Sequence, residues 1–205
     1  NRELSQLEFC RRVLFMARDG GLPTLERLRY LSITSGILDE FFEIRVAGLK
    51  QQADYGAVQR DADNLSAEEQ LEQVAAAAKA LVADLYATLN DELLPELKAQ
   101  KIRLLRSSEC TAAQVNWRKR FFAREVAPII SPVGLDPAHP FPEPANKNLA
   151  FIVTLEGRDA FGRDSRRAIV QAPRSLPRVI QLPEDCSDGE ECFVLLASVV
   201  RYFVS

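Results

Sequence analysis

SAEEQLEQVAAAAKALVADLYATLNDELLPELKAQ, the stretch at residues 66–100, decides the fold of the first half of this chain. Ser66 and Glu69 have the spacing of a capping box, so we expect a helix to begin there. The pattern runs to about Gln100, with a kink allowed at Pro95, and this length is typical of the spine of a helical bundle. The apolar side chains recur at the three- and four-residue intervals of one helix face, and they are Leu71, Val74, Ala78, Leu81, Leu85, Leu89 and Leu93.

Three shorter helices are predicted before this spine. The first spans residues 3–19, and the second runs from Pro23 to about Gly36, where glycine permits a break. Asp39 and Glu40 follow that break, and acidic side chains favour the positive end of a helix dipole. We therefore expect a third helix from there to about Tyr55-Gly56.

The character of the sequence changes beyond Pro128. Most of the prolines lie after this point, and β-branched runs replace the helical stripe. Thr111 is placed to cap a last helix that Pro128 ends. Strands are predicted at residues 149–155, 167–171, 178–182 and 192–196, the first two as a hairpin, and a closing helix at residues 197–203.

These patterns predict a mixed fold class. An all-α N-terminal helical bundle at residues 1–107 is followed, at residues 108–205, by an α+β domain with an antiparallel or mixed sheet. The boundary between them is expected between Lys101 and Ser108. Because the sequence stops at Ser205 inside an apolar stretch, with no capping residue or polar tail, we expect the second domain to be incomplete.

The composition is that of an ordinary globular protein, with 47% hydrophobic and 27% charged residues. A formal net charge of −3 leaves no broad basic face, so nucleic acid is not expected as a partner. No apolar run approaches the roughly 18–20 residues of a transmembrane segment, and the start is no secretion signal, so a cytoplasmic location is expected.

The thiols of the widely spaced cysteines are interpreted as reduced, and these are Cys10, Cys110, Cys186 and Cys192.

Two short motifs suggest catalysis. The segment GRDAFGRD at residues 157–164 has the glycine spacing of a phosphate-binding P-loop, but Arg163 and Asp164 stand where lysine and a hydroxyl residue are required. A solvated hairpin turn is the favoured interpretation. His139, the only histidine of the chain, lies among prolines that hold the backbone extended. A structural hydrogen bond is favoured over a role as phosphohistidine or general base.

Two charged clusters allow a functional and a structural interpretation. The basic cluster comprises Arg118, Lys119, Arg120 and Arg124. It could bind a polyanion, but the solvated face of an amphipathic helix is favoured. The acidic cluster comprises Asp39, Glu40, Glu43 and Arg45. It could hold a metal or an acid–base pair, but the helix dipole accounts for carboxylates in a first turn. Residue chemistry alone thus predicts no catalytic residue and no metal site.

Several blocks, in this order, resemble the beginning of the polyphosphate kinases. In the first half they are RELSQLEF at residues 2–9, LERLRYL at residues 25–31 and LDEFFEIRVAGL at residues 38–49. In the second half they are ISPVGLDPAHPFP at residues 130–142, Asn146-Lys147, and DAFGRDS at residues 159–165. The block at residues 38–49 is long and specific, and the resemblance covers nearly the whole chain.

The resemblance implies a helical N-terminal domain followed by a mixed α/β head domain through which the enzyme forms a homo-oligomer. Polyphosphate kinases reversibly transfer the terminal phosphate of ATP to inorganic polyphosphate through a phosphohistidine, releasing ADP. That histidine, Mg²⁺ and most nucleotide contacts would lie in C-terminal domains outside residues 1–205. This stretch alone is therefore expected to be an inactive N-terminal fragment without a tightly bound cofactor.

The sequence departs from the family at a few positions. Family members usually carry Ser-Asn-Asn where this chain has Ser35-Gly36-Ile37, and the second asparagine helps to hold the adenine of ATP. Ser35 and Asp39 flank that position and are candidate nucleotide-binding residues, although Ile37 cannot make the hydrogen bond. Gln6 and Cys10 replace a common tryptophan and asparagine. Two alternatives follow: a degenerate paralogue, or a helical interaction or assembly module without kinase activity.

Overall fold

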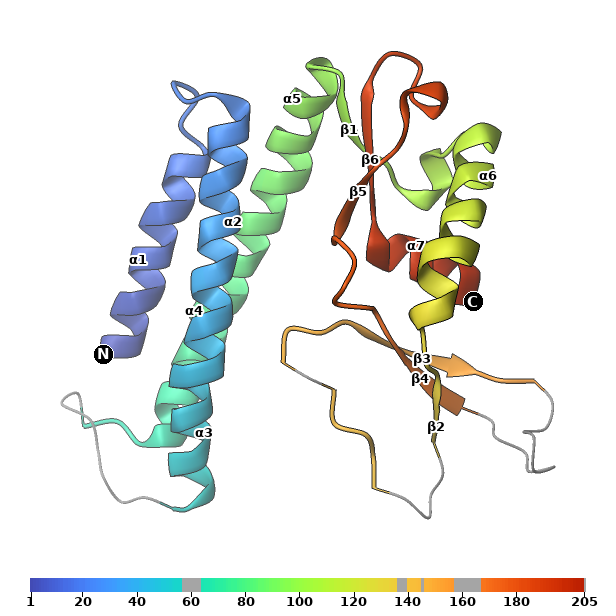
Figure 1. Cartoon of the computed structure of the whole chain (residues 1–205). Helices are drawn as coiled ribbons and strands as arrows, with labels where there is room; N and C mark the ends of the chain where they lie inside the picture. The colour runs from blue at the N-terminus through green and yellow to red at the C-terminus, as the bar shows by residue number, and fades with distance from the viewer. Residues whose placement is uncertain (57–63, 136–139, 145, 157–166, 205) are drawn as a thin grey trace. The chain divides into compact units, whose positions relative to one another are not determined.

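The computed structural model describes residues 1–56, 64–135, 140–144, 146–156 and 167–204. The chain divides into two compact units, Asn1–Gln100 and Lys101–Ser205 (Figure 1). The first unit is built from helices, and the second combines helices with two small sheets. The predicted fold class, an all-α bundle followed by an α+β domain, is confirmed. Among the described residues, no helix has the length and apolar character that crossing a membrane requires.

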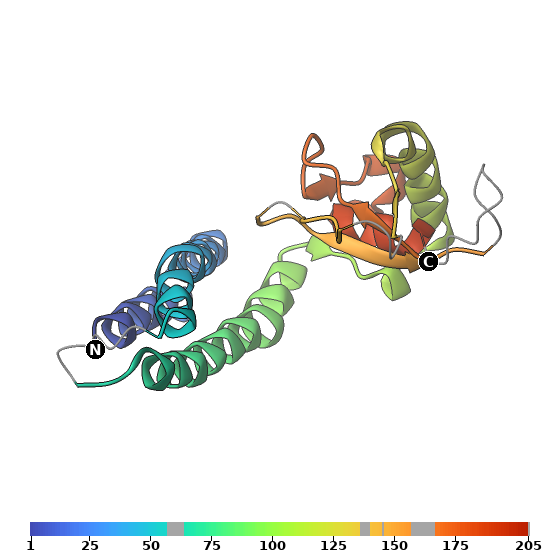
Figure 2. The same cartoon turned by 90° about the horizontal axis from the view of Figure 1, so that it is seen from below.

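Three helical runs form the first unit (Figures 1 and 2). The first run is α1 (Arg2–Ala17), and the second comprises α2 (Thr24–Glu40), the π-helical η1 (Phe41–Val46) and α3 (Ala47–Asp54). The third comprises α4 (Ala67–Ala87), the π-helical η2 (Thr88–Leu93) and α5 (Leu94–Ala99). The three runs share a core that contains Leu7, Cys10, Leu14, Ala17, Leu31, Leu38, Phe41, Val46, Val74, Ala78, Leu81, Leu85 and Leu93.

The break predicted at Gly36 is wrong, because α2 continues through this glycine into η1. Buried side chains recur on both sides of it, at Leu31, Thr34 and Leu38. Burying this stripe outweighs the roughly 1 kcal/mol that a glycine inside a helix costs relative to alanine. Asp39 therefore lies within a helix and not in a first turn.

Two other helix boundaries predicted from local signals, near Tyr55-Gly56 and at Ser66, are confirmed. α3 ends at Asp54, and Gly56 then adopts a φ of +60°. At the start of α4, Ser66 Oγ accepts a hydrogen bond from the Glu69 N–H, and the Glu69 carboxylate accepts one from the Ser66 N–H. The third run continues past Pro95, because η2 changes the backbone pairing just before the residue that has no N–H to donate.

The second unit begins with β1 (Ile102–Leu104), the 3₁₀ turn η3 (Ser107–Glu109) and α6 (Ala112–Phe121), which Thr111 caps as predicted. α6 continues as the π-helical η4 (Phe122–Val126) and the 3₁₀ turn η5 (Ala127–Ile129). The remaining elements are β2 (Val133–Gly134), β3 (Ala150–Thr154), β4 (Arg167–Gln171), β5 (Val179–Gln181), η6 (Glu184–Cys186), β6 (Glu191–Leu195) and α7 (Leu196–Val204).

Two three-stranded sheets organise the second unit. In the first, with order β1-β6-β5, β1 is parallel to β6 with Ile102 opposite Glu191, and β5 is antiparallel to β6. In the second, with order β2-β4-β3, both pairs are antiparallel and Ile152 lies opposite Ile169. Residues 101–107 belong to the second unit because β1 pairs with β6. The sequence did not predict β1 and β2, which are too short to show hydrophobic alternation.

The longer strands follow the sequence prediction closely. β3, β4 and β5 lie inside their predicted ranges, and β6 and α7 each begin one residue earlier than predicted. β3 and β4 form the expected antiparallel pair. The core of this unit draws on both sheets and on α7, and it contains Leu105, Val126, Val170, Ile180, Leu182, Cys186, Cys192, Val194, Leu196, Val199 and Val200.

Candidate functional site

A hollow of about 500 Å³ opens in the first unit between α1 and the run formed by α2, η1 and α3. We call it the α1–α2 hollow. Its volume falls in the range of small-molecule sites. The lining residues are Glu3, Gln6, Ile37, Glu40, Phe41, Ile44, Arg45, Gly48, Leu49 and Gln52.

The base of the α1–α2 hollow is apolar and its edges are polar. Phe41 and Leu49 are buried, Ile37 is half-buried, and Ile44 is exposed. Phe41, Ile44 and Arg45 all come from η1. The i→i+5 pairing of a π-helix widens this turn relative to an α-helix, and π turns recur at functional sites. The η1 turn thus places both apolar side chains and the Arg45 guanidinium at the α1–α2 hollow.

The charged side chains of the hollow come from opposite walls. Arg45 Nη1 lies 3.9 Å from Glu3 Oε1, and the two side chains are 42% and 13% exposed. At this separation and exposure the ion pair is weak, so the guanidinium keeps donors for another ligand. The lining residues include no histidine, cysteine, serine or lysine. This arrangement favours binding of a flat, partly apolar group with polar edges over covalent chemistry.

Ser35 and Asp39 lie outside the α1–α2 hollow. Both are exposed on α2, and neither lines it. Successive residues of an α-helix are about 100° apart, so Ile37 lies about 160° around the helix from each of them. Ile37, which lies between the two candidate residues in the sequence, therefore faces the hollow, while Ser35 and Asp39 face away from it.

The described residues contain no group of three or more His, Cys, Asp or Glu side chains that could hold a metal ion. Of the acidic cluster, Glu40 and Arg45 line the α1–α2 hollow while Asp39 does not. His139 and the segment at residues 157–164 lie outside the described residues. The four cysteines are free thiols, as predicted.

Arg118 is buried, so the prediction that the basic cluster forms a solvated helix face is wrong for this residue. It lies one turn after the buried Gln114 and points into the second unit. Its Nη2 donates to Ser107 Oγ at 3.0 Å and to the Ser198 carbonyl at 3.1 Å, and its guanidinium lies 5.0 Å from the centre of the Tyr202 ring. The other three basic side chains of the cluster are exposed, as predicted.

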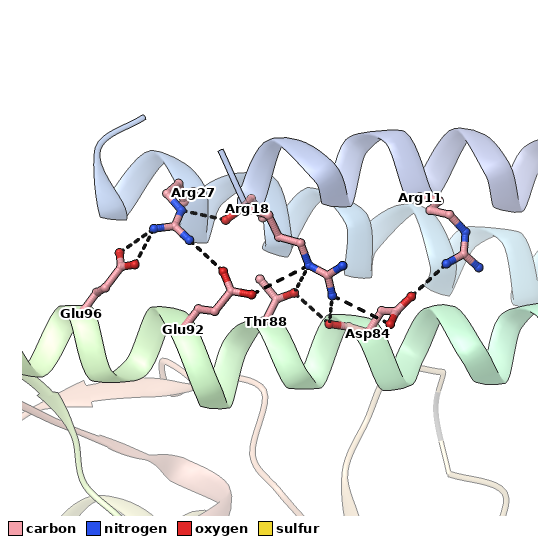
Figure 3. A network of polar contacts seen from close by, with 8 residues as sticks. Arg11, Arg18, Arg27, Asp84, Thr88, Glu92 and Glu96 are labelled. Carbon is pink, nitrogen blue, oxygen red and sulfur yellow. Dashed lines mark hydrogen bonds and ion pairs between the residues drawn. The ribbon is translucent and has the colours of Figure 1, made fainter. Parts of the chain in front are cut away.

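Ion pairs and hydrogen bonds anchor α1 and α2, which form two walls of the hollow, to the third helical run (Figure 3). The pairs are Arg11 with Asp84 at 2.9 Å, Arg18 with Thr88 at 2.7 Å, Arg27 with Glu92 at 3.1 Å and Arg27 with Glu96 at 2.6 Å. Arg27 is 5% exposed, and its Nε donates to the Ala17 carbonyl at the end of α1. The sequence did not predict these contacts, because they join residues that are far apart in the chain.

Comparisons with known proteins place both units in one family. The family profile of the polyphosphate kinase N-terminal domain matches residues 1–105, and that of the polyphosphate kinase middle domain matches residues 113–205. The chain belongs to the polyphosphate kinase family. The predicted resemblance is thereby confirmed for both halves of the chain.

Individual polyphosphate kinases agree with this assignment. The enzyme of Pseudomonas syringae pv. tomato is 52% identical over 98% of the chain, and that of Pseudomonas aeruginosa is 50% identical over 98%. The crystal structure of polyphosphate kinase from Porphyromonas gingivalis matches 98% of the chain with a TM-score of 0.79 and 25% identity. The chain spans 27% and 29% of the two Pseudomonas proteins and 29% of the Porphyromonas chain.

Two of the blocks that resemble polyphosphate kinases meet at the α1–α2 hollow. Glu3 and Gln6 come from residues 2–9, and most of the other lining residues come from residues 38–49. Gln6 and Ile37, two of the departures from the family pattern, also line it. Glu3 and Gln6 were not among the site residues predicted from the sequence. Their position inside a family-like block was the signal that could have indicated them.

Proposed function

We propose that this chain is the N-terminal part of a polyphosphate kinase that reversibly transfers the terminal phosphate of ATP to inorganic polyphosphate. The observation that carries the proposal is that residues 2–9 and residues 38–49 meet at the α1–α2 hollow, in a chain that belongs to this family. The volume, apolar base and polar edges of the hollow suit a nucleoside.

In this proposal the first unit forms one wall of the nucleotide site. The base lies against Ile37 and Ile44, and Arg45 supplies donors at the edge. Ser35 and Asp39, on the opposite face of α2, make no direct contact with the nucleotide. Because Ile37 offers no hydrogen bond, the base is held by shape and apolar contact, which discriminate weakly between bases.

We assign phosphoryl transfer itself to the rest of the protein. The described residues contain no cluster fit to hold Mg²⁺. Positioning and electrostatic stabilisation of the transferred phosphoryl group dominate such reactions. Residues 1–205 alone should therefore show negligible catalysis. We further propose that the phosphohistidine also lies outside residues 1–205, that the second unit serves subunit association, and that the enzyme acts in the cytoplasm.

A phosphotransfer assay tests the proposed function. Radiolabelled ATP and Mg²⁺ are incubated with the complete protein and, in parallel, with residues 1–205, and acid-insoluble polyphosphate is counted. We expect synthesis by the complete protein and none by residues 1–205. Absence of synthesis by the complete protein would favour the degenerate paralogue, and synthesis by residues 1–205 alone would show that the chemistry lies within this chain.

A further inference from the structure

One part of the second unit is locally cationic, although the whole chain has a net charge of −3. Residues 146–155 and 167–182, which include β3, β4 and β5, contain four basic side chains and no aspartate or glutamate. The basic residues are Lys147, Arg167, Arg174 and Arg178. Positive charge that is concentrated in this way raises the local concentration of anions.

A hollow of about 370 Å³ lies at the end of the β3–β4 pair within this region. We call it the β3–β4 hollow. The sheet ends there, with Ala150 opposite Gln171. Asn148 Nδ2 donates to Gln171 Oε1 at 2.9 Å, which positions both amides at the hollow. The lining residues are Ile129, Ser131, Asn148, Gln171, Ala172, Pro173 and Arg174.

Arg174 lines this hollow, and the guanidinium of Arg178 is held on the next carbonyl along the chain. Arg174 Nη2 donates to the Asn146 carbonyl, and Arg178 Nη2 donates to the Lys147 carbonyl. Asn146 and Lys147 are consecutive residues of one turn, so both guanidinium groups are anchored to the same turn. Each uses one donor on a neutral acceptor and has further N–H groups available.

Neither guanidinium is neutralised within the part of the chain that the structure describes. No carboxylate of those residues lies within ion-pair distance of Arg174 or Arg178. The arginines of the first unit differ, since Arg11 and Arg27 each face a carboxylate within 3.1 Å. Two guanidinium groups that are anchored to one turn and face no carboxylate suit phosphate oxygens, which guanidinium groups bind through paired hydrogen bonds.

We propose that the β3–β4 hollow binds a chain of linked phosphates through Arg174 and Arg178, with Ser131 and Asn148 as neutral donors. The choice of an inorganic phosphate chain rests on the proposed function, because polyphosphate is the polyanion that such an enzyme handles. One arginine on an exposed surface binds a single phosphate weakly. Two that are anchored to one turn can contact phosphates of one chain.

The test is the affinity of residues 1–205 for long-chain inorganic polyphosphate, measured by isothermal titration calorimetry at low salt. The double variant Arg174→Gln/Arg178→Gln should bind at least about tenfold more weakly than the unaltered chain. The matched control is Arg120→Gln/Arg124→Gln, which removes the same charge from exposed positions of the same unit. It should change the affinity by less than about twofold, because only general attraction is lost.

Several outcomes would overturn the inference. An equal loss of polyphosphate affinity in both double variants would show that the net charge attracts polyphosphate and that the β3–β4 hollow is not a specific site. Unchanged binding in Arg174→Gln/Arg178→Gln would place the polyphosphate elsewhere. Binding to phosphatidylglycerol vesicles, without binding to polyphosphate, would make the surface a lipid site. Circular dichroism confirms that both variants fold. The complete protein could make polyphosphate while Arg174→Gln/Arg178→Gln binds polyphosphate with unchanged affinity. In that case only this inference fails, and the proposed function stands.

Discussion

Arg27 Nη1 on α2 lies 2.6 Å from each carboxylate oxygen of Glu96 on α5. The Arg27 side chain is 7% exposed, whereas that of Glu96 is 41% exposed. The guanidinium is therefore largely removed from water, and Glu92 and the Ala17 carbonyl complete its partners. A buried cation depends on such partners for its stability, so these contacts tie α2 to the third helical run more firmly than surface pairs do.

Removing the partners of Arg27 should destabilise the first unit stepwise. Glu96→Gln should lower the free energy of unfolding by about 1–2 kcal/mol, because Glu92 still faces the guanidinium. Glu92→Gln/Glu96→Gln should cost about 3 kcal/mol, because the buried charge then has no carboxylate. Urea unfolding followed by circular dichroism measures both. The control is Glu26→Gln, whose exposed pair with Arg29 should contribute less than about 0.5 kcal/mol. A double variant as stable as this control would contradict the prediction.

The capping boxes at the starts of α4 and α6 should each contribute measurably to stability. Ser66→Ala and Thr111→Ala each leave an N–H at a helix start without its acceptor, and each should cost about 1 kcal/mol. Ser32→Ala is the matched control, since Ser32 lies within α2 and its hydroxyl bonds only to the Leu28 carbonyl. This control should be neutral or slightly stabilising. Equal losses in all three variants, measured by thermal unfolding, would show that the caps have no special role.

Arg118 should tolerate an apolar replacement of similar length better than truncation. Its Nε has no hydrogen-bond partner among the described residues, so part of its burial is uncompensated. Arg118→Met should keep the packing and change the free energy of unfolding by less than about 1 kcal/mol. Arg118→Ala should lose about 3 kcal/mol through the void it leaves. Equal loss in both variants, seen in urea unfolding, would instead assign the stability to the bonds with Ser107 and Ser198.

The buried thiols should resist alkylation and set an upper pH limit on stability. Burial raises the pKa of Cys10, Cys186 and Cys192 above the ordinary thiol value of 9.0. At pH 8, iodoacetamide should therefore modify the half-buried Cys110 first, as mass spectrometry can show. In the unfolded chain these thiols ionise near pH 9, while in the folded chain they remain protonated. Stability should thus be unaffected below pH 9 and fall as the pH rises above it.

The thiol prediction has a direct control. Cys110→Ser should remove the fast phase of alkylation and leave the slow thiols unchanged. Modification of Cys192 as fast as that of Cys110 in the unaltered chain would contradict the burial that the structure shows. A free energy of unfolding that rises between pH 9 and pH 10 would contradict the predicted effect of thiol ionisation on stability.

Ile37→Asn should strengthen nucleotide binding by the complete enzyme if the α1–α2 hollow receives the base. An amide there can hydrogen-bond a nucleobase, and one such bond corresponds to a decrease of about three- to tenfold in the KM for ATP. The kcat should stay unchanged, because the position does not face the reacting phosphate. The control is Ile33→Asn, at an exposed position of α2 that does not line the hollow. The same change in KM for both variants would place the base elsewhere.

Features that depend on near neighbours were predictable from the sequence. The helical stripe at residues 71–93 and the caps at Ser66 and Thr111 rest on contacts within one helical turn, and the structure confirms them. Two predictions that required knowledge of distant packing were wrong. Gly36 continues a helix, and Arg118 is buried, because the surrounding unit covers faces that local patterns leave undecided.

By itself the sequence determined the fold class, most of the helices and strands, and membership of the polyphosphate kinases, because periodicity, caps and family blocks are written in consecutive residues. Only the tertiary structure decided which of these residues share a site. It brings residues 2–9 and residues 38–49 to one hollow, turns Ser35 and Asp39 away from it, and holds Arg174 and Arg178 on successive carbonyls. The packing of a whole unit decides which residues become neighbours in space, and this packing cannot be predicted from a short stretch of sequence.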